Sequence, residues 1–337
     1  MNRYTPFLLL TGLLLAPLAA LHAAESGSPI TKGQRIYLVS VAEERGAGCQ
    51  PACEPIILAG WQPAPRPATS FRNRNYLTGH SFYRGFPAIL DEIVRSAGDA
   101  NNTIVGVSSR GGAIVDRHYG GVNVMAALTA GTVDVLTTTP IYLPDPGIEK
   151  FAQFGFQHNP TFRLTVMEFW LPYDNYEPGN YKSGPERIAP PAKVDHNAAT
   201  GESLEKIHRR YFDEMDAEVA RINQKLGTPV VWVVPVGQAV IALREKIIAG
   251  QVPGLKKQWD LFSDNLGHPK MPLTILMGYC HYAVIYRKSP VGLPVPKGLA
   301  GAKPPAELIR LLQELAWNAV SHHPLSGVRA DPSPAAK

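Results

Sequence analysis

The chain has 337 residues, of which 45% are hydrophobic and 18% charged, and its formal net charge is +5. These values are ordinary for a globular protein, and the length is sufficient for one large α/β domain. The lysines and arginines form no long run, so the sequence gives no argument for a nucleic-acid partner.

The first 24 residues have the pattern of a secretory signal peptide. Arg3 precedes an apolar stretch over 7–20, and small residues follow at the end of the leader, 21–24. The apolar stretch is short for a membrane span, although an uncleaved anchor is the alternative. We therefore expect a signal peptide over 1–24, an exported protein of the periplasm or the extracellular space, and no membrane span after cleavage.

Two of the three cysteines, Cys49 and Cys53, lie close together in a loop-like segment. In an exported protein this spacing predicts a small disulfide-closed loop. A metal site would need two further ligands nearby in the sequence, and none is there, so we expect no bound metal. Cys280 lies in an apolar segment and is expected to be a buried free thiol in a helix.

Apolar runs with strand character alternate with segments of helical periodicity. Strands are expected over 34–41, 76–78, 103–108, 133–137, 162–169 and 229–234. Helices are expected after Ser81 and over 122–130, 148–157, 202–226, 238–249, 272–286 and 306–319. A Pro/Gly/Asn-rich insertion without periodicity covers 174–200, and the tail 326–337 is expected to be flexible.

Strands that are separated by helices at these intervals predict βαβ units. The expected fold class is therefore α/β, with a mainly parallel sheet covered on both faces. No internal repeat or change of composition divides the chain after the leader, so 25–325 is expected to form a single domain. In open sheets of this kind, functional sites collect at the carboxyl ends of the strands.

Ser81 occupies such a position, between the extended run 76–78 and the helix that follows. The first amides of a helix favour negative charge, which suits a nucleophilic hydroxyl. The alternative is that Ser81 only caps the helix. Late in the chain, Asp264 and His268 offer the carboxylate and imidazole that activate a serine hydroxyl. Their alternatives are a turn or cap residue for Asp264 and a surface histidine for His268.

The serine, acid and histidine follow in an order that two hydrolase families share. An α/β-hydrolase elbow needs a second glycine where Tyr83 stands, which argues against that family. The blocks Gly79-His80-Ser81-Phe82 and Ser109-Arg110-Gly111-Gly112-Ala113, with the pair Asp264/His268, resemble the SGNH (GDSL-like) hydrolase superfamily over about 76–290. The resemblance implies a three-layer α/β/α fold with a flavodoxin-like sheet.

The resemblance also implies a role for each site residue. Ser81 would be the nucleophile, His268 the general base and Asp264 the partner of the imidazole. The amides of Ser81 and Gly112, beside Gly111, would bind the oxyanion, although the glycine pair could also simply permit a tight turn. No cofactor is expected.

The chain departs from the family pattern at three places. The run 134–140 has no asparagine where the family supplies an oxyanion donor, so Thr138 or Thr139 is expected to replace it. One additional residue separates Asp264 from His268, so either the loop bulges there or another acid orients the imidazole. His80 stands where the family has an acidic or amide residue.

Together these features predict an exported serine esterase that acts on a small-molecule or carbohydrate ester, with acetyl groups on a carbohydrate as one substrate type. The departures favour an alternative, a catalytically impaired glycan-binding protein. His118 is expected near the pocket, and the pair His322-His323 is expected to be solvated. The aromatic residues at 169–170 are expected in the core, although Trp170 and Tyr173 would also suit stacking on a sugar.

Overall fold

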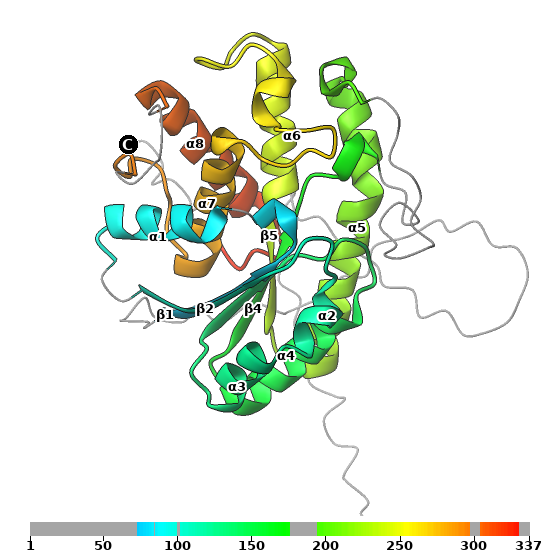
Figure 1. Ribbon diagram of the computed structural model, residues 1–337, viewed down its shortest axis with the longest axis vertical. Helices are drawn as coiled ribbons and strands as arrows, with labels where there is room; N and C mark the ends of the chain where they lie inside the picture. The colour runs from blue at the N-terminus through cyan, green and yellow to red at the C-terminus, as the bar shows by residue number, and fades with distance from the viewer. Residues whose placement is uncertain (1–72, 84, 100–101, 176–193, 297–303, 330–337) are drawn as a thin grey trace, which may run out of the picture. The chain divides into compact units, whose positions relative to one another are not determined.

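Five parallel strands form the central sheet of the structure, a computed structural model that describes residues 73–83, 85–99, 102–175, 194–296 and 304–329 (Figure 1). The strand order is β2-β1-β3-β4-β5, and every neighbouring pair is parallel. The strands are β1 (Asn73–Gly79), β2 (Asn102–Ser109), β3 (Val135–Thr138), β4 (Arg163–Glu168) and β5 (Val231–Pro235). The expected leader, the strand 34–41 and the Cys49–Cys53 disulfide lie outside the described residues.

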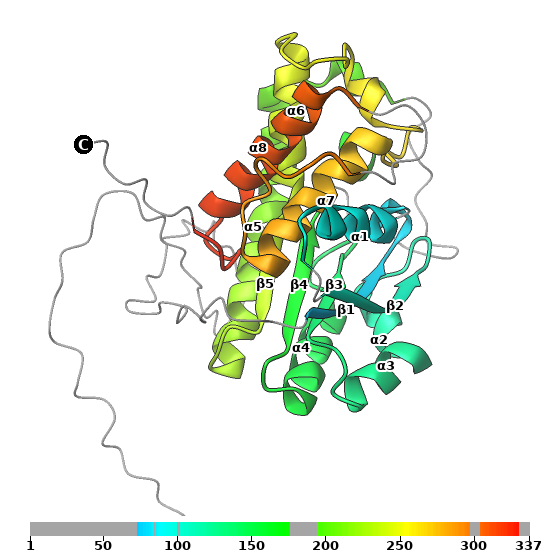
Figure 2. The same cartoon turned by 90° about the vertical axis from the view of Figure 1, so that its left-hand side faces the viewer.

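Helices cover both faces of the sheet, so the fold is three-layer α/β/α, as expected (Figure 2). One layer is made by α1 (Phe86–Ser96), α6 (Val236–Ile248), α7 (Met271–Tyr286) and α8 (Ala306–His322). The other is made by α2 (Val115–Tyr119), α3 (Val122–Thr129), α4 (Pro146–His158) and α5 (Gly201–Leu226). The long helix α5 runs along β5 and contacts both α4 and α6.

Helix α7 is mostly apolar and is enclosed by α1, α6, α8 and the sheet. Gly278 allows α1 to approach closely, since a Cβ at this position would lie 2.6 Å from Cδ1 of Ile93. Cys280 is buried in the same helix as a free thiol, as the sequence predicted, and burial raises its pKa. Among the described helices, none is both long and apolar enough to cross a membrane.

The structure confirms the predicted alternation of strands and helices and adds α2, which the periodicity did not predict. Five residues are too few to show a helical period, and the first amides of α2 are satisfied from another part of the chain. Asp145 Oδ2 accepts a hydrogen bond from Val115 N (2.7 Å), and Oδ1 accepts one from Asp116 N (3.0 Å). Oδ1 also accepts from Gly147 N (3.0 Å), so Asp145 caps α4 as well.

Candidate active site

Ser81 lies just beyond the carboxyl end of β1 and is the first residue of a short 3-10 turn, η1 (Ser81–Tyr83). Helix α1 begins only at Phe86, with Gly85 as its N-cap residue and no side-chain cap. The alternative that Ser81 caps this helix is therefore wrong. The Ser81 side chain is partly exposed, and its hydroxyl makes no hydrogen bond with another described residue.

Tyr83 fixes the serine turn to the core of the protein. The Tyr83 N–H donates to His80 O at 3.0 Å and closes the turn. Its ring lies against the end of β1, where a Cβ on Gly79 would be 2.6 Å from the ring, and its hydroxyl lies 2.9 Å from His281 Nε2 in α7. Tyr83, the bulky residue that argues against an α/β-hydrolase elbow, thus anchors the turn in the core.

Asp264 and His268 lie together in the loop between η6 (Gln258–Leu261) and α7. His268 Nδ1 is 2.6 Å from Asp264 Oδ2, and Asp264 Oδ1 accepts hydrogen bonds from the amides of Gly267 (3.1 Å) and His268 (3.2 Å). The additional residue is accommodated by a turn in which Gly267 has a φ of +93°, a value that favours glycine. Partial burial raises the pKa of Asp264, but these hydrogen bonds outweigh it and lower the pKa.

Trp170 joins the serine turn to the acid–histidine loop. Its ring stacks on Phe82, next to Ser81, with centroids 5.1 Å apart, and its Nε1–H donates to Gly267 O at 2.9 Å. The His268 ring meets the same Phe82 ring edge-on at 5.2 Å. Trp170 is 1% exposed, so it belongs to the core and offers no face for stacking on a sugar. The sequence predicted its burial but not this connection.

His80 and His118 are buried beneath the serine turn. Burial, with the neighbouring His268 and His118, lowers the pKa of His80 to about 3, so its ring is neutral at physiological pH. Its Nδ1 accepts a hydrogen bond from Phe82 N at 3.3 Å, which leaves the ring proton on Nε2, 3.5 Å from Thr139 Oγ1. His118 Nδ1 lies 3.3 Å from Ser108 Oγ, and burial lowers its pKa as well.

The candidate oxyanion residues flank the end of β1 on both sides. The Arg110 amide donates to Gly79 O at 3.0 Å, which brings the turn at Gly111 and Gly112 beside the serine turn. Gly112 has a φ of +64°, and its amide donates to no other described residue. Thr138 ends β3 and is fully buried, with no hydrogen-bond partner for Oγ1. Thr139, the next residue, contacts the serine turn instead, because its Oγ1 lies 3.5 Å from His80 Nε2.

The structure corrects the expectation for the pair His322-His323. His322 is exposed, but His323 is only 4% exposed and faces Glu168 at the end of β4 and Asp216 of α5. Burial raises the pKa of Glu168 to about 8, against the opposing effect of His323. Sequence reasoning missed this cluster because its three residues are far apart along the chain.

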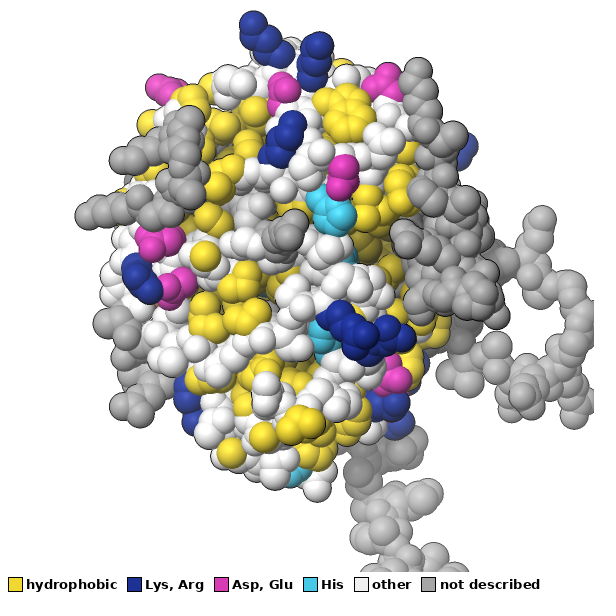
Figure 3. All heavy atoms as spheres, in the orientation of Figure 1, with side chains coloured by type: hydrophobic (Ala, Val, Ile, Leu, Met, Phe, Trp, Pro, Cys, Tyr) yellow, Lys and Arg dark blue, Asp and Glu magenta, His cyan; other side chains and the backbone are white. Residues whose placement is uncertain are grey.

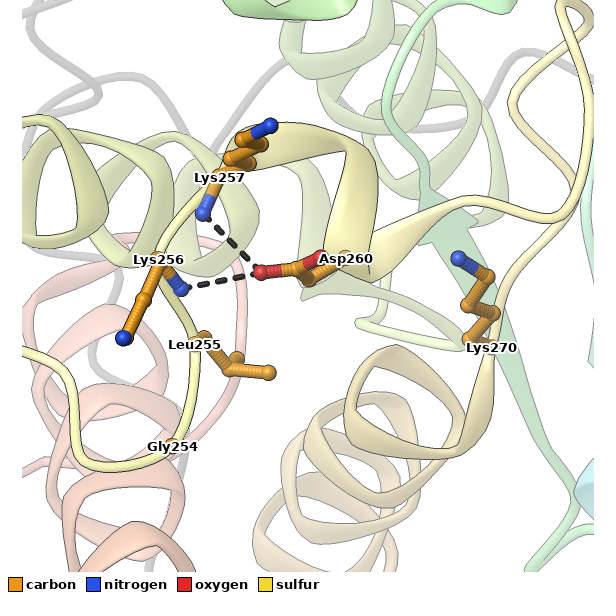
Figure 4. A pocket seen from close by; sticks show the side chains of 6 residues that line it. All are labelled: Gly254, Leu255, Lys256, Lys257, Asp260 and Lys270. Atoms are coloured by element: carbon orange, nitrogen blue, oxygen red, sulfur yellow. Dashed lines mark hydrogen bonds between the residues drawn. The ribbon is translucent and has the colours of Figure 1, made fainter.

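A pocket of about 500 Å³ is lined by residues of the segment that precedes α7 (Figure 4). It is lined by Gly254, Leu255, Lys256, Lys257, Asp260 and Lys270, and thus by none of the predicted catalytic residues. Asp260 accepts hydrogen bonds from the backbone amides of Lys256 and Lys257, so it fastens the loop. On the face drawn in Figure 3, acidic and basic side chains are interspersed among apolar ones.

Comparison with known proteins finds distant similarity to solved structures. No family model matches the chain, and no curated protein matches it. A DUF4886 family protein from Bacteroides uniformis aligns over 74% of this chain and 94% of its own, with 12% identity and a TM-score of 0.46. A candidate GDSL-like lipase from Parabacteroides merdae aligns over 64% of this chain and 97% of its own (11%, 0.41).

A third solved structure, of a gut microbial diltiazem-metabolizing enzyme, aligns over 62% of this chain and 45% of its own, with 14% identity and a TM-score of 0.34. All three TM-scores are below 0.5, so these likenesses assign neither a family nor a reaction.

Proposed function

We propose that the protein is an SGNH-type serine hydrolase that cleaves a carboxylic ester, with Ser81 as nucleophile, His268 as general base and Asp264 as the partner of the imidazole. The observation that carries the proposal is the position of His268. Its Nδ1 is held by Asp264 at 2.6 Å, while its ring contacts Phe82, the residue after Ser81. The other ring nitrogen, Nε2, has no hydrogen-bond partner among the described residues.

In this proposal Ser81 Oγ bonds to the carbonyl carbon of the ester while His268 Nε2 takes the hydroxyl proton. The proton then passes to the departing alcohol as the ester C–O bond breaks, and an acyl-enzyme remains. Water hydrolyses it through the same base. Asp264, whose pKa is lowered, stays ionised at neutral pH and holds the Nδ1–H tautomer.

The negative charge of the tetrahedral intermediate needs donors near Ser81. We assign this role to the backbone amides of Ser81 and Gly112, with Gly111 giving the turn its shape. Thr138 or Thr139 was the expected third donor, but both side chains are buried, which argues against contact with substrate. A site with two amide donors instead of three would lose about a hundred- to a thousandfold in rate relative to one with three.

The proposed substrate is a small-molecule or carbohydrate ester outside the cytoplasm. The expected leader over 1–24 supports an exported location, where acetylated polysaccharides are accessible. The chemistry proposed for the site does not depend on which alcohol or acyl group the ester carries.

Replacement of Ser81 by alanine tests the proposal directly. S81A should lower turnover of p-nitrophenyl acetate at least about a thousandfold and abolish labelling by a fluorophosphonate, because both reactions need the hydroxyl. S96A, at the end of α1, is the matched control and should keep wild-type rates. Equal turnover in S81A and S96A would show that Ser81 is not the nucleophile.

One observation favours the alternative of a glycan-binding protein without catalysis. No hydrogen bond joins Ser81 to His268 among the described residues. Catalytic hydrogen bonds are often long before substrate binds, so the missing hydrogen bond between Ser81 and His268 does not by itself exclude catalysis. A protein that binds an acetylated oligosaccharide, but resists the fluorophosphonate and hydrolyses no ester, would establish this alternative.

A further inference from the structure

Three buried side chains with metal-ligating atoms converge in a cluster that includes none of the proposed catalytic residues. Glu168 is the last residue of β4, Asp216 lies in α5, and His323 follows the last residue of α8. They are 0%, 7% and 4% exposed, and one ligand atom from each lies within 4.8 Å of the other two. Three separate elements of the fold therefore deliver a nitrogen and two carboxylate groups to one buried point.

The cluster contains a buried polar atom without a partner among the described residues. Glu168 Oε1 makes no hydrogen bond, whereas the buried Asp216 Oδ1 and His323 Nε2 face each other at 3.3 Å. Gln238 donates to Glu168 Oε2 at 3.2 Å and holds that carboxylate in place. Within the described ranges, no lysine or arginine forms an ion pair with either carboxylate. The His323 imidazole, 3.3 Å from Asp216 and 3.9 Å from Glu168, is the one group of opposite charge that the described residues offer the two buried carboxylates.

The spacing of the cluster partly matches that of a tetrahedral metal site. His323 Nε2 lies 3.3 Å from Asp216 Oδ1 and 3.9 Å from a Glu168 oxygen. Ligand atoms about 2.0–2.1 Å from Zn²⁺ are separated from one another by roughly 3.3–3.4 Å in a tetrahedron. One edge of the cluster already has this length, and movement of the Glu168 carboxylate by about half an ångström would bring the second close to it.

We propose that Glu168, Asp216 and His323 form a buried binding site for a divalent transition-metal cation, with Zn²⁺ as the ion that best matches the donors and their spacing. One imidazole nitrogen and two carboxylate oxygens are ligands that Zn²⁺ accepts. The double positive charge would balance both carboxylates. Because the ligands come from β4, α5 and the end of α8, the cation would tie the C-terminal helix to the sheet.

Binding requires one rearrangement at His323. The Leu325 amide donates to His323 Nδ1 at 3.2 Å, which places the ring proton on Nε2. Coordination through Nε2 moves that proton to Nδ1, so the Leu325 hydrogen bond must be exchanged for the bond to the metal. Proton exchange at the Leu325 amide should therefore change when the metal binds.

The experiment uses the untagged full chain, first dialysed against EDTA and then titrated with ZnCl₂ by calorimetry. The neighbouring histidines give a matched pair of variants. H323Q should bind Zn²⁺ at this site at least about 100-fold more weakly than the wild type, since loss of even an outer-shell partner costs 10–100-fold. H322Q, which changes an exposed histidine, should keep the wild-type affinity.

E168Q is a second variant of nearly unchanged shape, and it should lose the site in the same way. Zn K-edge absorption on the loaded wild type should show only nitrogen and oxygen ligands. Equal affinity of H322Q and H323Q, no Zn²⁺ uptake by the wild type, or sulfur ligands from Cys49 and Cys53 would each overturn the proposal. If H323Q fails to fold, the absorption spectrum of the wild type and the affinity of E168Q decide.

Discussion

One indole side chain, that of Trp170, connects the two loops that carry the proposed nucleophile and base. The stacking on Phe82 and the hydrogen bond to Gly267 O act on residues adjacent to Ser81 and His268. Catalysis is sensitive to small displacements, and a buried positioning residue can hold two such loops in register. Trp170 is thus a positioning residue of the proposed site.

Replacement of Trp170 by phenylalanine keeps an aromatic ring against Phe82 but removes the Nε1–H donor. We expect W170F to lower kcat for p-nitrophenyl acetate about tenfold, with little change in KM, because Gly267 O loses its partner and the His268 loop loosens. W317F in α8 is the control. An unchanged kcat in W170F would show that Trp170 does not position the catalytic loops, and this conclusion does not depend on the result for S81A.

At the scale of elements, Asp145 shows how a single carboxylate can start two helices. It accepts hydrogen bonds from two amides of α2 and one of α4, although these helices are separated by a strand and a helix. The N-cap residue of α2, Ile114, has no polar side chain and makes no capping hydrogen bond of its own. Helix α2 therefore exists because the tertiary fold brings Asp145 to it.

Replacement of Asp145 by alanine leaves three amides without their acceptor. We expect D145A to lower the free energy of unfolding by about 2–4 kcal/mol, since a lost cap costs about 1–2 kcal/mol and buried unpaired amides add to it. Urea unfolding followed by circular dichroism measures the change. D91A, which breaks an exposed ion pair with Arg95, is the control, and its free energy of unfolding should stay within about 0.5–1 kcal/mol of the wild-type value. A change as small as this in D145A would contradict the capping role of Asp145.

At the scale of the whole molecule, the buried ion pair between Arg244 and Asp174 connects several loops. Arg244 of α6 is fully buried, and its Nη1 and Nη2 donate to the two carboxylate oxygens of Asp174. Its Nε donates to Gln258 Oε1 at 2.6 Å. The same Asp174 lies 2.9 Å from His196 Nδ1. Residues before and after the segment 176–193 are thereby joined to η6, the turn that leads to the Asp264–His268 loop.

This network predicts a pH dependence of stability. Burial raises the pKa of Asp174, but hydrogen bonds from Arg244 and His196 outweigh it and lower the pKa to about 2, from an ordinary 3.8. Because the folded-state pKa is below the unfolded value, the ionised carboxylate stabilises the fold above pH 4. That contribution is lost as the pH falls through about 2.

D174N should therefore be less stable than the wild type by about 3–5 kcal/mol at pH 7, because Arg244 is left as a buried unpaired charge. The difference should shrink by about 2 kcal/mol between pH 5 and pH 2. Urea unfolding across this range measures it, with E205Q in an exposed pair of α5 as the control. A difference that is independent of pH would show that Asp174 does not titrate as described.

Much of this protein could be predicted from local patterns. Helical periodicity after Ser81, strand-like runs such as 103–108, and their alternation determine a parallel α/β sheet, because periodicity reports which face of each element is buried. The same order of elements places Ser81 at the carboxyl end of a strand. The acid–histidine contact was also predictable, since Asp264 and His268 are close enough in sequence for one turn to join them.

Only the tertiary structure decided which distant side chains meet. The sequence indicated that Trp170 is buried but not that it touches Gly267, and it placed His323 in solvent where the fold buries it beside Glu168 and Asp216. The capping of α2 by Asp145 has the same origin. Sequence patterns act over a few residues, whereas packing joins residues that are remote in the chain. The positions of the proposed catalytic groups were therefore set locally, and their mutual arrangement and the buried cluster were set by the fold.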